Sequence, residues 1–430
     1  MIQYIKITNY GGIRDQVELN FEAVNEEGSP AYVVEMPDKV KLLKLMYIYG
    51  PNASGKTTVL KAFHFLRGLW LNPAYSRDEQ LDFDPFLFRS DGQEVPSEIE
   101  LAFYSGGIRH IYFVQFTKRS ILKEKMVFYQ TNQPAELFDR TTDLEKQVSY
   151  VQFGSKIKSV AKAMNALETA TLHNNSVLGA FQKTNVDIPE IGQLNKWAKN
   201  YLPLMIDART RLSEFTAMRI TQDPKFAKWM NTFLNKADRN IREVSVTVEK
   251  SGRPGEDTEQ ILAGRLPDPQ QRLMYDIVNY GKISLLHGLK DMQGYSLPFE
   301  KESNGTQRYF GLGGVLYILL VNPGFVTVDE LDTSLHADLM KHFLQLFLLN
   351  SHESQLLFTT HNLNLLEDSD LIREDALWFT EKGSEGEVSL FSAADFDSSK
   401  LRKGASLINA YKSGRLGAKP NLGSPYINAE

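Results

Sequence analysis

The feature that most constrains this chain is a glycine-bounded turn between an apolar segment and an amphipathic one. Residues 50–57 read GPNASGKT, which fits the pattern G-x-x-x-x-G-K-[ST]. An apparent strand at 44–49 precedes the turn and an apparent helix at 57–69 follows it, as the pattern requires. Glycines at both ends let successive N–H groups point inward, and the helix adds the positive end of its dipole. The sequence therefore predicts a phosphate-binding loop for a nucleoside triphosphate.

The residues of this loop are expected to share the binding of ATP and Mg²⁺. Lys56 would reach the β- and γ-phosphates, and the hydroxyl of Thr57 would coordinate the Mg²⁺ ion that bridges them. We expect further contacts to the nucleotide from the rest of the loop and the start of the helix, namely Gly50, Pro51, Asn52, Ala53, Ser54, Gly55 and Thr58.

The composition limits what the remaining residues can be. At 430 residues the chain exceeds one ordinary core, so we expect two domains or one large domain with an insertion. The chain has no cysteine, which excludes disulfides, thiolate zinc sites and a cysteine nucleophile. A formal net charge of -5 gives nucleic-acid binding no support, although a local basic face is compatible with it. No signal peptide or bilayer-spanning run is visible, so we expect a cytoplasmic protein without a membrane partner.

Residues 1–146 are expected to form the first half of the nucleotide-binding domain, built mainly of strands around the phosphate loop. Alternating apolar residues predict strands at 2–7, 17–21 and 42–49, and a hairpin of 98–104 and 109–116 joined at Gly106 and Gly107.

A mainly helical insertion is predicted at 147–250. Apolar residues recur three and four positions apart in KIKSVAKAMNALETATL and FAKWMNTFLNKADRNIREV, and we interpret these stripes as packing faces. A polar Gly/Pro loop at 251–257 opens the second half of the nucleotide-binding domain, 251–400, where strands resume near 282–286. Residues 401–430 form a tail.

Two acids at the end of another apolar run, GFVTVDE at 324–330, supply what a phosphate loop lacks. A strand ending in Asp329 would place one carboxylate at the carboxyl edge of the sheet, where it can bind the Mg²⁺ shell. Glu330 lies one residue further on and is suited to polarise the attacking water. Together with the phosphate loop, these acids predict hydrolysis of the nucleotide.

Two further segments complete the expected site. The run LLFTTHN at 356–362 would bring His361 to a neighbouring strand end, where it could contact and sense the γ-phosphate in a catalytic role. The segment ESNGTQR at 302–308 contains the Ser-x-Gly turn of Ser303, Asn304 and Gly305 and precedes an apolar, helix-capable run from Tyr309. A Ser-x-Gly turn that opens a helix binds anions. Because the chain already has a phosphate loop, this second turn suggests a two-fold dimer in which each loop faces the turn of the other subunit.

In their order along the chain, these elements resemble the ABC-type ATPase heads of the SMC, Rad50, RecF and OLD group. The segments ESNGTQR, VDELDTSLH, QLLFTTHNLNLL, IREDALWF and GRLGAKP are similar to those of the prokaryotic AAA15-type ATP-binding proteins, which include abortive-infection and related anti-phage ATPases. The similarity is weakest at 147–250. It implies an α/β fold, an ABC-type P-loop ATPase head with a mixed sheet flanked by helices and an inserted, mainly helical lobe.

The resemblance also implies roles for individual residues. Ser303 and Gly305 would be signature residues acting in trans, and residues 331–334 would be the D-loop that crosses the dimer interface. Asn304 stands where typical ABC transporters have glycine. Gln115 is a candidate for the glutamine loop, and an ordinary strand glutamine is the alternative.

Three functions compete: an ATPase switch whose dimer or higher oligomer controls a separate effector, a DNA-tethering or repair ATPase of the Rad50 type, and a fused ATPase–nuclease like OLD. A Rad50 type needs a long coiled coil, whereas the insertion contains Pro189, Pro203 and Pro224. A nuclease needs a later metal-binding domain, but only 33 of the 430 residues follow the Asp395–Asp397 pair. The switch is favoured, and the family then implies an effector, a nuclease or toxin encoded nearby, in anti-phage defence.

Overall fold

The computed structural model describes residues 1–24, 29–88, 95–202, 205–247, 282–288, 294–362 and 373–396, and six single residues at 365, 371, 409, 411, 413 and 417. Two compact units share the chain. The first comprises Met1–Asp207, Pro323–Leu331 and His352–Glu430, and the second comprises Ala208–Asn322 and Asp332–Ser351. The stretch 147–250 is thus divided between them. The polar loop expected at 251–257 and all but four residues of the tail at 401–430 lie outside the described residues.

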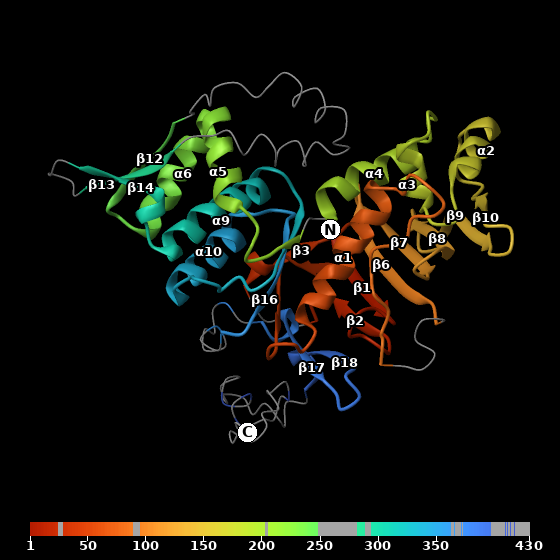
Figure 1. Ribbon diagram of the computed structural model, residues 1–430, viewed down its shortest axis with the longest axis horizontal. Helices are drawn as coiled ribbons and strands as arrows, with labels where there is room; N and C mark the ends of the chain where they lie inside the picture. Colours follow the sequence, from red (N-terminus) through yellow and green to blue (C-terminus); the bar gives the residue numbers. More distant parts are fainter. Residues whose placement is uncertain are drawn as a thin grey trace, which may run out of the picture. The chain divides into compact units, whose positions relative to one another are not determined.

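The first unit contains a six-stranded sheet, of which Figure 1 labels β16, β17 and β18. Its first five strands are parallel and its last pair is antiparallel. Strands β5 and β16 are buried along their whole length, which explains their continuous apolar sequences. In order the strands are β11 (Met205–Ile206), β15 (Phe325–Val328), β16 (Gln355–Thr360), β5 (Leu45–Tyr49), β17 (Leu377–Lys382) and β18 (Val388–Ser392). The carboxyl ends of β15, β16 and β5 therefore meet at one edge.

Helix α1 (Lys56–Leu71) follows β5 directly, which confirms the predicted strand–turn–helix. Its apolar face packs against aromatic residues of a second sheet: the Trp70 ring lies 4.8 Å from that of Tyr112, and the Phe65 ring 4.6 Å from that of Phe116. The α/β fold class predicted from the sequence is confirmed.

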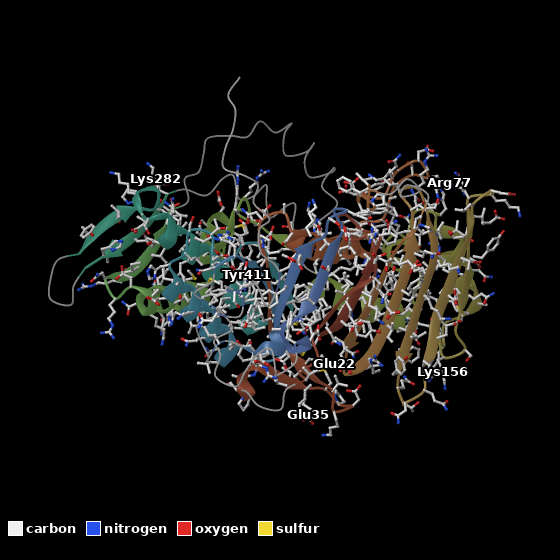
Figure 2. The ribbon with its side chains drawn as sticks, turned by 90° about the horizontal axis from the view of Figure 1, so that it is seen from below. Glu22, Glu35, Arg77, Lys156, Lys282 and Tyr411 are labelled. Carbon is white, nitrogen blue, oxygen red and sulfur yellow. The ribbon has the colours of Figure 1, made fainter. Side chains whose placement is uncertain are left out.

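The second sheet of the first unit is antiparallel, and Figure 2 shows its outer strands side by side. It contains the predicted hairpin, with Gly106 and Gly107 both at positive φ in the turn. Its strands, in order, are β10 (Val148–Phe153), β9 (Ala135–Asp143), β8 (Ile121–Tyr129), β7 (Ile108–Phe116), β6 (Ser97–Ser105), β1 (Ile2–Thr8) and β2 (Val17–Asn20). The smaller elements of this unit are β3 (Val33–Glu35), β4 (Lys41–Leu43), α2 (Ala161–Ala170), α3 (Val177–Gln182) and α4 (Pro189–Tyr201).

Residues 171–176, which we call the polar strap, fasten the end of α1 to this antiparallel sheet. The Ser176 hydroxyl donates to the carbonyl oxygen of Leu69 at 2.6 Å. On the other side, the Arg140 guanidinium of β9 donates to the carbonyl oxygen of His173 at 3.1 Å. The polar residues of the strap are all buried: Thr171, His173, Asn174, Asn175 and Ser176. The helix that starts at the phosphate loop is therefore anchored at its far end by hydrogen bonds.

The second unit packs helices over a small sheet. Helix α9 carries the glycine-rich run 311–314, and these glycines let α5 approach closely. A Cβ at Gly311 would lie 2.7 Å from Cβ of Leu212, and a Cβ at Gly314 would lie 2.3 Å from Oγ1 of Thr216. The elements are α5 (Leu212–Gln222), α6 (Pro224–Ala237), β12 (Ile241–Val246), β13 (Ile283–His287), β14 (Tyr295–Pro298), α9 (Asn304–Val321) and α10 (Ala337–Asn350).

Two segments within the stretch predicted to be mainly helical are strands. Residues 148–153 form β10, because their alternating side chains pair with β9. The helical spacing that continues to residue 244 breaks at Asp238, whose carboxylate accepts a hydrogen bond from the backbone N–H of Asn240 and so turns the chain into β12. Within the described residues, no helix has the length and apolarity to cross a bilayer.

Candidate nucleotide site

The phosphate loop is shaped by glycines that no larger residue can replace without strain. A Cβ at Gly50 would lie 2.5 Å from Oγ1 of Thr380. Gly55 has φ +100°, and a Cβ there would lie 2.5 Å from Cγ2 of Val388. Strands β17 and β18 therefore press against the loop from one side.

Lys56 is buried within the loop. Its ammonium donates to the carbonyl oxygens of Gly50 at 2.8 Å and Pro51 at 3.0 Å. Helix α1 begins at this lysine and has no side-chain cap, since its N-cap residue is Gly55. Backbone N–H groups at an uncapped helix start can bind an anion.

A chain of hydrogen bonds joins the loop to the acids after β15. The Thr57 hydroxyl donates to Oδ2 of Asp329 at 2.8 Å, and the Thr359 hydroxyl donates to Oδ1 of the same carboxylate at 2.6 Å. The backbone N–H of Glu330 in turn donates to Oγ1 of Thr359 at 2.8 Å. The neighbouring strand β16 thus positions both acids through one buried hydroxyl.

Glu330 has a left-handed backbone, with φ 51°. Such a conformation costs a non-glycine residue about 1–2 kcal/mol, so the surrounding bonds must hold it. Besides the bond to Thr359, the next N–H, of Leu331, donates to the carbonyl oxygen of Thr359 at 3.1 Å.

A cavity of about 450 Å³ opens over the loop, within the roughly 300–1,000 Å³ typical of small-molecule sites. The loop residues 52–58 and Glu330 line one part of it. The rest is lined by Gly11 and Gly12, by residues of the segment 84–88, and by the β17–β18 hairpin.

His361 follows β16 at the same sheet edge, as predicted. Its side chain is exposed, and its backbone carbonyl accepts a hydrogen bond from the Tyr49 hydroxyl at 3.0 Å. The ring of Tyr411, labelled in Figure 2, covers Tyr49 with 4.9 Å between ring centroids.

The remaining predicted residues belong to the second unit. Ser303 caps α9, its hydroxyl accepting from the N–H of Thr306 at 3.1 Å. Asn304 is exposed in the first turn, and a Cβ at Gly305 would lie 3.1 Å from the carbonyl oxygen of Ser334, in the expected D-loop. The predicted anion-binding turn is therefore a helix N-terminus.

A cavity of about 830 Å³ lies beside this helix start. Asn304 and Ser334 line it together with four basic residues, Arg209, Arg211, Lys282 and Arg308, and two acidic ones, Glu214 and Glu300. The excess of basic residues favours an anion in this cavity.

The donor set fits Mg²⁺. A threonine hydroxyl and one carboxylate, 2.8 Å apart, are the hard oxygen ligands that Mg²⁺ combines with phosphates and waters. Among the described residues there is no cluster of three or more His, Asp or Glu that could hold a metal by itself.

Two open assignments have structural answers. Gln115 lies inside β7, and its amide donates to Oε1 of Glu98 on β6 at 2.6 Å, as an ordinary strand glutamine does. Asp395 accepts from the backbone N–H of Ser392 in a capping box, and Asp397 lies outside the described residues.

Sequence reasoning missed Thr359 and Thr380, which hold Asp329 and Ser54 respectively. The available signal was a threonine at a buried position near the end of an otherwise apolar strand. A buried hydroxyl needs a partner, and at this sheet edge the partners are the loop and the acid.

Comparison with protein families matches residues 45–367 to a model described as "AAA domain, putative AbiEii toxin, Type IV TA system". No curated protein matches the chain by sequence.

Solved structures of SMC heads are similar to this chain. The SMC head domain from Thermotoga maritima is 13% identical with a TM-score of 0.40, over 91% of this chain and 98% of that one. An SMC head bound to the C-winged helix domain of ScpA is 12% identical with a TM-score of 0.44, over 91% and 97%. An SMC head with an extended coiled coil, bound to the C-terminal domain of ScpA derived from Pyrococcus furiosus, is 11% identical with a TM-score of 0.42, over 94% and 98%.

Proposed function

The chain belongs to this AAA-domain family, whose model matches residues 45–367, and we propose that it binds Mg²⁺·ATP and hydrolyses it as a nucleotide-dependent switch. The observation that carries the proposal is the 2.8 Å hydrogen bond between Thr57 of the phosphate loop and Asp329 after β15. It joins a phosphate-binding turn to an acid, as nucleotide hydrolysis requires.

In the ATP complex, Lys56 exchanges its carbonyl partners for phosphate oxygens, and the N–H groups at the start of α1 bind the same phosphates. Thr57 and Asp329 hold the metal, which when bound neutralises charge on the phosphates. Glu330 lines the cavity and accepts the proton of the attacking water, and His361 senses the γ-phosphate from the end of β16.

Self-association completes the site in this proposal. The start of α9, with Ser303, Asn304 and Gly305, contacts the nucleotide bound to a second copy of the chain. Support comes from the exposure of Ser303 and Asn304 at the start of the helix and from the excess of basic residues in the 830 Å³ cavity beside it. The ATP-bound dimer then differs from the free monomer, which is what a switch needs.

The switch acts on a separate effector, a nuclease or toxin, in a prokaryotic anti-phage or abortive-infection system. The support is the sequence resemblance to defence ATPases together with the family description, which refers to a toxin–antitoxin system. A neighbouring reading frame that encodes the effector is expected.

Turnover of Mg²⁺·ATP tests the enzymatic part. Lys56→Ala should abolish hydrolysis, and Lys61→Ala, an exposed lysine of the same helix, should hydrolyse ATP like the wild type. Unfolding of each variant is followed by circular dichroism, because Lys56 also bonds two loop carbonyls. Wild-type turnover in Lys56→Ala would contradict the assignment.

Light scattering with ATP tests the shared site. A Glu330→Gln chain should be dimeric, whereas the same chain carrying Asn304→Asp should stay monomeric, because the added charge repels the nucleotide of the other copy. Asn304 is exposed, and an acid at a helix start does not destabilise the helix. Monomers in both cases would refute the shared site.

Co-purification of this chain with the products of neighbouring reading frames tests the effector. ATP turnover that DNA stimulates in the absence of an effector would instead favour a repair ATPase.

A further inference from the structure

An exposed apolar pair stands at the rim of the nucleotide cavity. All 25 phenylalanines of the chain are described, and Phe88 alone among them is exposed, at 75%. Leu87 beside it is 61% exposed, whereas Phe86 is 1% exposed. Both Leu87 and Phe88 line the cavity over the phosphate loop. The two aromatic rings of this segment therefore have different surroundings: Phe86 is buried in the core, and Phe88 borders the cavity.

Among the described residues, the Phe88 ring is contacted by the β17–β18 hairpin and by Phe86. Gly386, in the turn of the β17–β18 hairpin, has φ +84°, and a Cβ there would lie 3.1 Å from Cδ2 of Phe88. The ammonium of Lys382 lies 6.0 Å from the ring centre, and the Phe86 ring 5.9 Å away. A Cβ at Gly386 would crowd the edge of the ring, so glycine lets the hairpin turn approach Phe88 closely, while Phe88 stays 75% exposed.

The rim segment is also tied to the phosphate-binding helix. The backbone N–H of Gly11 donates to the carbonyl oxygen of Asp84 at 2.6 Å. A Cβ at Gly11 would lie 2.8 Å from Cγ2 of Thr58, in the first turn of α1. The ring and the uncapped helix start are therefore parts of one cavity wall.

The part of this cavity beyond the phosphate loop, lined by Leu87 and Phe88, offers room for the base of a nucleotide held by its phosphates. Resting on the proposed function, we propose that Phe88 stacks on the purine base of the bound nucleoside triphosphate, with Leu87 covering the edge of the base. An aromatic ring offers every base a π-face, so this contact accepts adenine and guanine alike. The affinity for the nucleotide then has two separable contributions, one from the phosphates at Lys56 and one from the base at Phe88.

Calorimetric titration separates the two parts, with the non-hydrolysable analogue AMP-PNP and inorganic tripolyphosphate as probes, each with Mg²⁺. Phe88→Ala should weaken AMP-PNP binding on the order of tenfold, the typical effect of losing one stacked base. It should leave tripolyphosphate affinity unchanged, because that probe has no base. Phe88→Tyr should restore AMP-PNP affinity, and Tyr150→Ala, an exposed aromatic of β10, should bind both probes like the wild type.

The outcomes distinguish this inference from the function on which it rests. If the wild type binds neither probe, both fail. If Lys56→Ala loses AMP-PNP while Phe88→Ala keeps it, the nucleotide site stands and the base contact is refuted. Equal weakening of both probes by Phe88→Ala would mean that the ring only supports the loop. Unchanged AMP-PNP affinity with loss of the ATP-dependent dimer would mean that it contacts a second copy, and either result overturns the stacking.

Discussion

Thr359→Val removes the one hydroxyl that positions both acids of the site. Valine has nearly the same shape as threonine, and residue 359 is fully buried, so the change leaves no cavity and admits no water. It leaves Oδ1 of Asp329 without the 2.6 Å bond and the N–H of Glu330 without the 2.8 Å bond.

The magnitude follows from these two contacts. A hydrogen bond to a charged group contributes about 1.5–3 kcal/mol and one between neutral groups about 0.5–1.5 kcal/mol, so the free energy of unfolding should fall by roughly 2–4 kcal/mol. Glu330 also loses a bond that holds its φ at 51°, and its carboxylate should move toward an ordinary backbone conformation. Because misplacement by about 1 Å can cost 10²-fold in rate, turnover should fall on the order of a hundredfold.

Urea denaturation and single-turnover ATP hydrolysis measure the two effects. Thr359→Ser keeps the hydroxyl and serves as the matched control, with turnover close to the wild type. If Thr359→Val unfolds at the wild-type urea concentration and hydrolyses ATP at the wild-type rate, the hydroxyl does not position the acids and the reasoning is wrong.

Three further predictions concern other parts of the chain. Glu330→Gln should bind Mg²⁺·ATP with the wild-type affinity but hydrolyse it at least about a hundredfold more slowly. Asp329→Asn should instead weaken Mg²⁺-dependent ATP binding. Equal losses of ATP affinity in the two variants would contradict these roles. Gly314→Ala should lower the free energy of unfolding by about 1–3 kcal/mol in urea denaturation, because its Cβ would meet Thr216, and adding Thr216→Ala should recover part of the loss. Burial lowers the pKa of His110 from 6.5 to about 4. The unfolded chain therefore binds the extra proton first, and about 3 kcal/mol of stability should be lost as the pH falls from 6.5 through 4, in a thermal-unfolding series where His110→Phe shows a smaller slope.

The sheet edge could be predicted because parallel strands place their carboxyl ends together. Three apolar runs lead into residues of distinctive chemistry: the phosphate loop that contains Lys56, the carboxylate of Asp329, and His361. The sequence alone therefore assigns these residues to one edge of the sheet. The Ser-x-Gly turn that opens a helix was predicted from local turn chemistry, and the structure shows Ser303 as the residue that caps this helix.

What the sequence did not reveal depends on contacts between distant segments. The role of Thr359 depends on a side-chain bond from β16 to the end of β15, which no periodicity encodes. Phe88 lies in a stretch without secondary structure, so neither its exposure nor its position at the cavity follows from a pattern. Strand β10 was not predicted, because the apolar residues that follow it from residue 156 recur at helical spacing and the whole stretch was interpreted as mainly helical.

The polar strap ties the local opening of α1 to that of the antiparallel sheet. Its five polar residues are buried, so freeing the last turn of α1 exposes hydrogen-bonding groups on both sides of the strap at once. Fraying of the helix alone is therefore unfavourable, because the polar groups that it releases have no hydrogen-bond partner until the polar strap also separates from Arg140. We therefore expect amide protons in the final turn of α1 and in β9 to exchange with solvent through one shared opening, at the end of α1 opposite the phosphate loop.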